Sequence, residues 1–420
     1  MRMLTSRKRV ILAIEHKEPD MVPVDFGGWE GSGGIHALAL KKLIEHLGLH
    51  EEIRVYDVIQ MLAEPPYFLL KKFGVDVVSV RRSMPPTGLT EEDIKFKDYF
   101  LLGEKVKVPE DIPIIKGDNG YEYLPAWFSR DPEKRRILVA RRSPSTPYFE
   151  PVPFYAPLKD VSSASEIKEL PPHPWITEYS EHELKILRKN AQYLYEKTDY
   201  AICGLSMTSV FEVTMYLLGH RTFALCLKRN KNVIEKVVEL VLEHNKMELR
   251  KYLDAVGEYI QIICTGGEDL GSQTGPFINP KEWRELFRPA IEELVKEIKS
   301  RTKCYVMIHS CGSIKPFIPD FIEMGIDILN PVQISAKDMD PYELKKEFGD
   351  DITFWGGGCD TQHILPFASP REVKEHVKKL VNIFKEGGGF IFNQVHNIQP
   401  GVPPENIIAM FEAVNEVREY

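Results

Sequence analysis

The feature that most constrains the fold is a series of eight short apolar runs, most of them separated by helical patterns. The runs cover residues 22–26, 75–80, 200–205, 259–265, 304–309, 326–331, 352–356 and 390–395. Strands that alternate with helices predict a parallel sheet, and eight is the number that closes a (β/α)8 barrel. We therefore expect an α/β fold, a (β/α)8 TIM barrel. The alternative is a doubly wound open sheet.

The helical patterns between the later strands contain residues that are typical of helix boundaries. Apolar residues recur at helical spacing over 282–299, after Asn279-Pro280, a pair typical of an N-cap followed by proline at the first helical position. Pro289 inside this run is expected to kink or split the helix. Residues 232–253 and 370–386 show the same periodicity and predict two further helices.

Residues 84 to about 175 interrupt the alternation. Asn119-Gly120 stands beside alternating residues and predicts a hairpin, while prolines cluster between 144 and 174. Because this stretch is too proline-rich to form a large core of its own, we expect one barrel domain over residues 1–420. Residues 84–175 are then an inserted β-rich segment within it.

Composition restricts the function classes. The 420 residues are 43% hydrophobic and carry a net charge of −8, enough for a large core and unfavourable for a nucleic-acid partner. The first residues lack the apolar core of a signal peptide, and no stretch is apolar enough to span a bilayer. We expect a cytoplasmic protein with no nucleic-acid and no membrane partner, and leave a homodimer open.

The strongest chemical signal is His309 and Cys311, two soft metal ligands on the same side at the end of an apolar run. His396 ends a second apolar run about 85 residues later. A His-Cys-His set predicts a three-ligand zinc site whose open fourth position is typical of catalysis. A buried histidine and core cysteine are the alternative, and His396 could instead hydrogen-bond a substrate.

The other cysteines predict no chemistry. Six cysteines in a chain of this length do not form a disulfide framework. Cys203, Cys264, Cys304 and Cys359 lie in or at the ends of apolar runs, so we expect them to be buried as small hydrophobic residues.

Polar residues gather at the ends of the predicted strands, where the mouth of a barrel carries its active site. They are Asp25, Arg81, Arg82, Glu268, Asp269, His309, Cys311, Gln333, Cys359, Asp360 and His396. We expect Asp25, Gln333 and Asp360 to bind substrate, although Asp360 also fits a helix cap after a tight glycine turn.

Three carboxylates are candidates for acid–base catalysis. Glu268 and Asp269 could orient a metal-bound histidine or move a proton, with a solvated loop as the alternative. Glu212 begins an otherwise apolar helix, where a carboxylate needs a partner or a place at the barrel mouth. No glycine-rich dinucleotide motif or P-loop follows any of the strands.

With these motifs the chain resembles the uroporphyrinogen decarboxylase superfamily, whose fold is a (β/α)8 barrel, over nearly its full length. Residues 7–24 resemble its first helix and strand, and residues 278–289 the segment before its long helix. Asp57 lies in a stretch similar to the family's aspartate motif. Asn393 and His396 match its C-terminal Asn-x-x-His signature. The resemblance implies that Asp57 and Asn393 bind substrate.

The superfamily has a decarboxylase branch that uses no cofactor. Its members hold a porphyrinogen with arginines in the loop after the first strand, with an aspartate and with a tyrosine. In this chain that loop, residues 26–33, contains no arginine, and Glu212 stands at the position of the tyrosine. A polycarboxylate substrate needs cations, so decarboxylation is disfavoured.

The other branch comprises zinc-dependent corrinoid methyltransferases, marked by His-x-Cys and a C-terminal cysteine. His309 and Cys311 match, whereas His396 takes the place of the second cysteine. The resemblance implies Zn²⁺ and a corrinoid (methylcobamide), which a partner corrinoid protein would carry because no Asp-x-His-x-x-Gly motif is present. We expect methyl transfer between that partner and a small thiol, or a methoxylated or methylamine-type compound. The alternatives are a porphyrinogen decarboxylase and a non-catalytic tetrapyrrole-binding protein.

Overall fold

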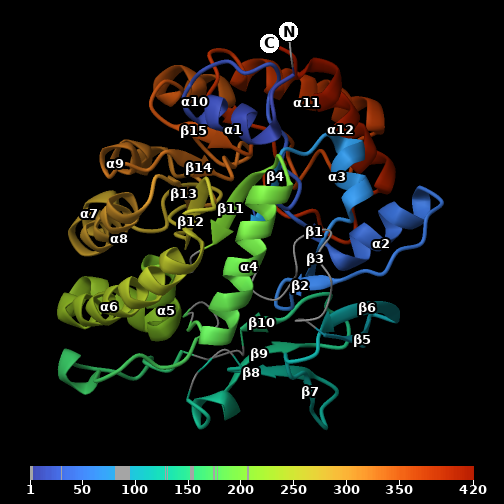
Figure 1. The fold of residues 1–420 in the computed structure, drawn as a ribbon. Helices are drawn as coiled ribbons and strands as arrows, with labels where there is room; N and C mark the ends of the chain where they lie inside the picture. The colour runs from blue at the N-terminus through green and yellow to red at the C-terminus, as the bar shows by residue number, and fades with distance from the viewer. Residues whose placement is uncertain are drawn as a thin grey trace.

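One curled parallel sheet forms the centre of the molecule (Figure 1). The computed structural model describes residues 3–29, 31–80, 95–127, 129, 131–151, 156–173, 176, 178–205 and 208–420. The sheet has the order β16-β15-β14-β13-β12-β11-β4, with every neighbouring pair parallel. Its strands are β4 (Val77–Val80), β11 (Ala201–Leu205), β12 (Ile262–Gly267), β13 (Tyr305–His309), β14 (Ile328–Asn330), β15 (Thr353–Trp355) and β16 (Phe390–Ile391). All seven fall within predicted runs or overlap them.

The eighth predicted run, residues 22–26, closes the ring. Val24 forms a parallel bridge with Phe392, whose N–H donates to the Pro23 carbonyl at 2.8 Å. On the other side the N–H of Asp76 donates to the Val24 carbonyl at 2.7 Å. The segment therefore lies between β16 and β4, the two edges of the sheet. The expected (β/α)8 barrel is confirmed.

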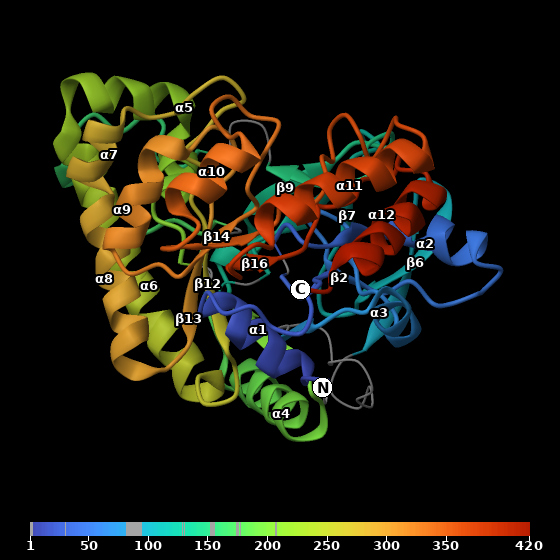
Figure 2. The ribbon, with the colours of Figure 1, turned by 90° about the horizontal axis from the view of Figure 1, so that it is seen from above.

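Helices surround the sheet (Figures 1 and 2). They are α2 (Ala37–His46), α3 (Tyr67–Phe73), α4 (Glu181–Lys197), α5 (Phe211–Arg229), α6 (Lys231–Val256), α7 (Pro280–Leu286), α8 (Arg288–Arg301), α9 (Ile318–Glu323), α10 (Pro341–Phe348), α11 (Pro370–Phe384) and α12 (Pro404–Val417). The helix expected over 282–299 is split at Phe287, because Pro289 can occupy only the first turn of a new helix. The other two predicted helices are α6 and α11.

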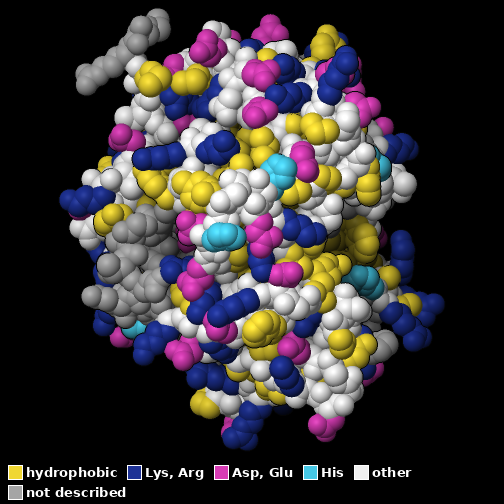
Figure 3. Space-filling model, turned by 90° about the vertical axis from the view of Figure 1, so that its right-hand side faces the viewer, with side chains coloured by type: hydrophobic (Ala, Val, Ile, Leu, Met, Phe, Trp, Pro, Cys, Tyr) yellow, Lys and Arg dark blue, Asp and Glu magenta, His cyan; other side chains and the backbone are white. Residues whose placement is uncertain are grey.

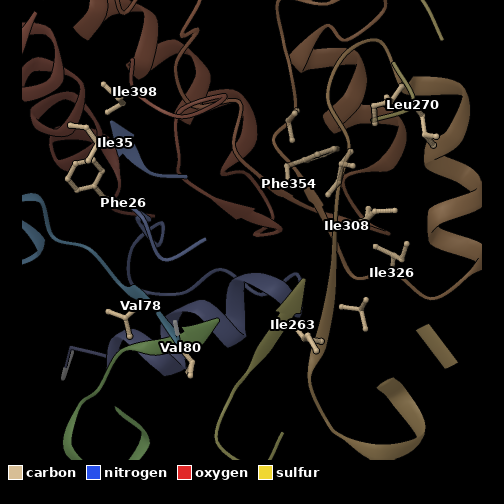
Figure 4. Close-up of a cluster of buried hydrophobic side chains, with 14 of the residues drawn as sticks. Phe26, Ile35, Val78, Val80, Ile263, Leu270, Ile308, Ile326, Phe354 and Ile398 are labelled. Atoms are coloured by element: carbon tan, nitrogen blue, oxygen red, sulfur yellow. The ribbon is translucent and has the colours of Figure 1, made fainter. Parts of the chain in front are cut away.

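Strand alternation sorts the apolar side chains into two layers. One cluster fills the barrel: Val77, Ala201, Cys203, Ile262, Cys264, Met307, Ile328, Trp355 and Ile391, with Val10, Ala13 and Ile14 of α1 (Ser6–Ile14) and with Trp29. The alternate residues, such as Val78, Val80, Ile263, Ile308 and Phe354, belong to the larger cluster that includes the helices (Figure 4). The barrel is thus a packed core and not a pore.

Helix α1 closes the end of the barrel where the strands begin (Figure 2). The carbonyl of Ala13 accepts the N–H of Gly389, just before β16, at 2.8 Å, and the carbonyl of Ile14 accepts the Thr353 hydroxyl at 3.3 Å. The opposite end, where the strands finish, is therefore the one that can hold a site.

Within the range expected to be an inserted β-rich segment, the described residues form antiparallel strands on the side of the molecule opposite the termini (Figure 1). Its strands are β5 (Phe96–Leu101), β6 (Glu104–Pro109), β7 (Ile115–Lys116), β8 (Glu122–Pro125), β9 (Leu138–Arg142) and β10 (Glu150–Pro151). The hairpin predicted at Asn119-Gly120 joins β7 to β8, with Gly120 at φ +80°. Arg81 and Arg82 lie outside the described residues. A separate small sheet holds β1 (Ile35–His36), β2 (Val55–Asp57) and β3 (Leu62–Ala63).

The surface carries mixed charge. Lys, Arg, Asp and Glu side chains are interspersed over the face shown in Figure 3. Within the described ranges, no helix combines the length and apolarity needed to cross a bilayer.

A buried ion-pair cluster around Asp76 joins the two chain ends to the barrel. The Asp76 carboxylate accepts hydrogen bonds from Arg9 at 2.5 Å, Arg418 at 2.7 Å, Ser6 at 2.7 Å and the N–H of Val24 at 3.0 Å. The side chains of Asp76 and both arginines are at most 7% exposed. One carboxylate thus holds α1, the end of α12 and the closing segment together.

Replacing Asp76 with alanine is expected to lower the free energy of unfolding by about 3–5 kcal/mol, because Arg418 is left buried without its carboxylate. Urea denaturation measures the change. Asp98→Ala is the control, since Asp98 pairs with Lys105 and Lys107 at the surface, where water screens the ion pairs, and its loss should change stability far less. Equal losses in the two variants would show that the cluster adds nothing beyond a surface pair.

Candidate functional site

His309, Cys311 and His396 meet at the end of the barrel where the strands finish. His309 is the last residue of β13, Cys311 follows two residues later, and His396 comes after β16. Their ligand atoms all lie within 4.8 Å of one another, with Cys311 Sγ 3.4 Å from His309 Nε2. Because β14 and β15 separate the two strands, only the curl of the sheet brings His396 to the other two residues. His309 is buried, whereas Cys311 and His396 are partly exposed.

The ring of His309 is held by an amide. Its Nδ1 lies 2.7 Å from Oδ1 of Asn330, an oxygen that can only accept, so Nδ1 carries the proton and donates it. The Nδ2 group of Asn330 donates to the Trp355 carbonyl at 2.9 Å, and the Ser32 hydroxyl donates to Oδ1 at 2.8 Å. In the neutral ring, Nε2 of His309 is then left with a lone pair on the side of Cys311.

His396 is held in the opposite tautomer. Its Nδ1 accepts the N–H of Asn397 at 2.8 Å, which places the ring proton on Nε2. Burial, followed by the neighbouring His309, lowers the pKa of His396 to about 4, so the ring is neutral near pH 7. To offer Nε2 to a metal, the ring must first release the Asn397 N–H.

Two of the three candidate carboxylates are bound to backbone. Glu268 accepts the N–H groups of Val210 at 2.6 Å and Phe211 at 2.8 Å and so caps the start of α5. Burial raises its pKa to about 8, although these two hydrogen bonds favour the charged form. Asp269 accepts the Cys311 N–H at 2.7 Å, and its Oδ1 lies 3.6 Å from Nε2 of His309.

Glu212 differs from these two carboxylates. A Cβ atom placed on Gly267 would lie 2.4 Å from its Oε2 and 3.7 Å from Cδ2 of His309, so the carboxyl covers Gly267 next to the histidine ring. The Tyr216 hydroxyl donates to Oε1 at 3.3 Å. Burial first, then the charges of Asp269 and Glu268, raise the pKa of Glu212 well above its usual value.

Asp25 and Asn393 hold the loop after the first strand. Asp25 accepts the Gly28 N–H at 2.6 Å, Nε1 of Trp355 at 3.0 Å and Nδ2 of Asn393 at 3.2 Å. Asn393 also donates to the Gly33 carbonyl at 3.4 Å, and both side chains are fully buried. Their predicted substrate-binding role stays a prediction.

Asp57 and Gln333 also have partners within the protein. Asp57 accepts the N–H groups of Ile59 and Gln60 and the side-chain amide of Gln60, within its own turn. Burial raises the pKa of Asp57. Oε1 of Gln333 accepts the Gly312 N–H at 2.8 Å and so fixes the loop that carries Cys311.

Asp360 has the contacts of a turn cap. It accepts the N–H groups of Gln362 at 2.7 Å and His363 at 3.2 Å. Substrate binding by Asp57, Gln333 and Asp360 is neither supported nor contradicted by their hydrogen bonds.

The four cysteines expected in the core, Cys203, Cys264, Cys304 and Cys359, are buried.

The sequence interpretation missed Ser32, Asn330 and Trp355 as neighbours of the site. A signal existed for Asn330. Ile328 faces the barrel interior, so the alternation of β14 places Asn330 inward, just as Met307 predicts the inward direction of His309. Ser32 lies 277 residues from His309 and has no comparable local signal.

Gly312 allows the Cys311 loop to adopt its conformation. Its φ is +84°, and a Cβ there would lie 2.4 Å from backbone atoms of Gly271. We expect Gly312→Ala to cost roughly 1–3 kcal/mol of stability from the backbone strain alone. Because the loop must move, Cys311 should also shift away from the two histidines, which would weaken the binding of a metal ion by the three residues. Thermal unfolding and metal analysis measure both effects. Gly275→Ala, with nothing within 4 Å of its added Cβ, should change neither; identical behaviour of the two variants would contradict this account.

Comparisons with known proteins agree with the fold. The model of the family described as uroporphyrinogen decarboxylase (URO-D) matches residues 154–417. Uroporphyrinogen decarboxylase of Chlorobium phaeobacteroides is 24% identical over 179 residues, 40% of this chain and 48% of that protein. The enzyme of Serratia proteamaculans is 33% identical over 73 residues, 17% of this chain and 20% of that protein. The chain thus spans about half the length, or less, of these curated relatives.

Among solved structures, the chain is similar to a methyltransferase from Methanosarcina mazei, with a TM-score of 0.56 and 15% identity. The match covers 98% of this chain and 99% of the other. At this identity the likeness shows a shared fold.

Proposed function

Because the chain belongs to the uroporphyrinogen decarboxylase family, we propose that it is a zinc-dependent methyltransferase within that family. It would move a methyl group between a corrinoid protein and a small thiol, or a methoxylated or methylamine-type compound. The observation that carries the proposal is the group of His309, Cys311 and His396, whose ligand atoms lie within 4.8 Å of one another.

The donor set fits zinc. Imidazole nitrogen and thiolate are ligands that zinc prefers, and a half-buried group of three leaves room for a fourth, exchangeable ligand. His309 already directs a lone pair on Nε2 toward Cys311, and His396 would add Nε2 once its ring turns away from Asn397. When bound, zinc would favour the thiolate form of an acceptor thiol or polarise the leaving heteroatom of a methyl donor.

Glu212 is the best candidate for holding the transferred proton. Glu268 is bound to the first N–H groups of α5, and Asp269 is bound to the N–H of Cys311. For Oε2 of Glu212, the part of the chain that the structure describes supplies no hydrogen-bond donor. That oxygen could give a proton to a leaving oxygen or nitrogen, or take one from an acceptor thiol. The cap formed by Glu268 starts the helix at Phe211 and so places Glu212.

The decarboxylase alternative has less support. In the resemblance, Asp57 corresponds to the family's substrate-binding aspartate, and its contacts within its own turn do not decide between the two functions. The loop of residues 26–33 contains no arginine to pair with a polycarboxylate.

The test uses purified, zinc-loaded protein and an isotopically labelled methyl group. Labelled methyl should pass from methylcobalamin, free or on the corrinoid protein, to a thiol, with release of cob(I)alamin. In the opposite direction it should pass from a methyl ether or methylamine to cob(I)alamin supplied in reduced form. Chelation of the zinc should stop both transfers. Conversion of uroporphyrinogen to a less carboxylated product would overturn the proposal. Tight pigment binding without turnover would favour the non-catalytic alternative.

A further inference from the structure

We propose that Asn330 is a positioning residue that selects the metal-binding tautomer of His309. The inference rests on the proposed function only in taking the metal to be zinc. It concerns a residue at the end of β14 that touches His309 and forms no part of the His309, Cys311 and His396 group.

The orientation of the Asn330 amide is fixed by its other partners. Nδ2 donates to the Trp355 carbonyl at 2.9 Å, so the amide cannot turn over without placing an oxygen against an oxygen. The Ser32 hydroxyl donates to Oδ1 at 2.8 Å, while its own oxygen accepts Nε1 of Trp29 at 3.0 Å. The Ser32 hydroxyl therefore presents a proton to Oδ1 of Asn330, while the Trp355 carbonyl accepts from its Nδ2 group.

Burial makes the choice of tautomer strict. Asn330 and Ser32 are fully buried, and His309 is 8% exposed. With the proton on Nε2 instead, Nδ1 of His309 and Oδ1 of Asn330 would be two acceptors 2.7 Å apart. The Nε2 proton would then point toward Cys311, whose Sγ lies 3.4 Å away. The amide thus keeps the Nε2 lone pair available before any metal arrives.

His396 shows that this arrangement is not automatic for a histidine at this mouth. Its Nδ1 accepts the backbone N–H of Asn397, and it therefore has the opposite tautomer. The two histidines lie with ring centroids 6.0 Å apart and differ in what their Nδ1 atoms meet. A carbonyl-type acceptor opposite Nδ1 is what prepares His309 as a ligand.

Two substitutions separate positioning from mere packing. Asn330→Ala removes the shorter of the two contacts to Nδ1 of His309 and leaves the Ser32 hydroxyl 3.2 Å away, a group that can either donate or accept. We therefore expect zinc affinity, measured by competition with a chelating dye, to fall about 10- to 100-fold. Asn330→Asp keeps an acceptor for His309 but loses the donor to the Trp355 carbonyl. It should unfold more easily than the wild type yet retain zinc affinity within about threefold, or bind more tightly. Asn406→Ala is the control, since that buried amide donates to the carbonyls of Leu365 and Ala368, which lie outside the group of three ligand residues.

A spectroscopic readout tests the tautomer directly. In metal-free wild type, nitrogen-15 NMR of the His309 ring should show Nδ1 protonated, and Asn330→Ala should show a mixture. A proton on Nε2 in the wild type, or equal loss of zinc affinity in the Asp and Ala variants, would overturn the inference. The wild-type spectrum decides even where a variant fails to fold. Absence of zinc from the wild type would instead overturn the proposed function, because the metal-free ring is measured separately.

Discussion

Cys311→Ala is expected to purify without zinc and to lose methyl-transfer activity by more than about 100-fold. Substituting a residue that merely contacts a metal ligand lowers metal affinity or activity by up to about 100-fold, so loss of the ligand itself should cost more. Cys311 supplies the thiolate of the group, and its Sγ lies 3.4 Å from Nε2 of His309. Without it, two imidazole ligands remain, a set too weak to retain zinc through purification. Elemental analysis beside the labelled-methyl assay measures both losses.

The matched control is Cys226→Ala. Cys226 is also a free cysteine, and it lies near the end of α5, 14 residues beyond the Glu212 that faces the site. This variant should retain zinc and activity. Full zinc content in Cys311→Ala, or equal losses in both variants, would remove Cys311 from the metal site.

Glu212→Gln is expected to lower kcat by about 10²- to 10⁴-fold while zinc stays bound, the range typical of losing a general acid or base. Glutamine retains the size of the side chain and an oxygen that can accept from Tyr216, but it cannot give or take the transferred proton. Single-turnover transfer rates and metal analysis on the same preparation separate chemistry from zinc loss.

Two variants complete this experiment. Tyr216→Phe removes the hydrogen bond to Glu212 and leaves the carboxyl in place, so its kcat should change by less than about tenfold. A wild-type rate in Glu212→Gln together with a large loss in Asp269→Asn would assign the proton to Asp269, whose Oδ1 lies 3.6 Å from Nε2 of His309.

Much of the fold could be predicted because its determinants are local. Each strand is an apolar run, and the split between α7 and α8 follows from the missing N–H and the bulky ring of Pro289. The weakest part is the closing segment, residues 22–26, where the structure has a single bridge at Val24. The sequence predicts its apolar character, whereas its bonds to Asp76 and Phe392 depend on the two sheet edges meeting.

The candidate site also has features that the local sequence predicts and features that depend on contacts between distant residues. His309 and Cys311 share one strand end, so their proximity can be predicted from spacing alone. The cap that Glu268 forms on α5 joins residues 58 positions apart, and only the packing of β12 beside that helix start produces it. The opposite tautomers of the two histidines depend on hydrogen bonds to Asn330 and to the Asn397 N–H, and the hydrophobic pattern of the sequence predicts neither bond.

X-ray absorption at the zinc edge, on protein purified without chelator, tests the central claim most directly. We expect one zinc per chain, coordinated by one sulfur and two imidazole nitrogens from Cys311, His309 and His396. The fourth ligand should be light and exchangeable. Protein without zinc, or zinc with no sulfur neighbour, would contradict the assignment of these three residues as a catalytic metal centre.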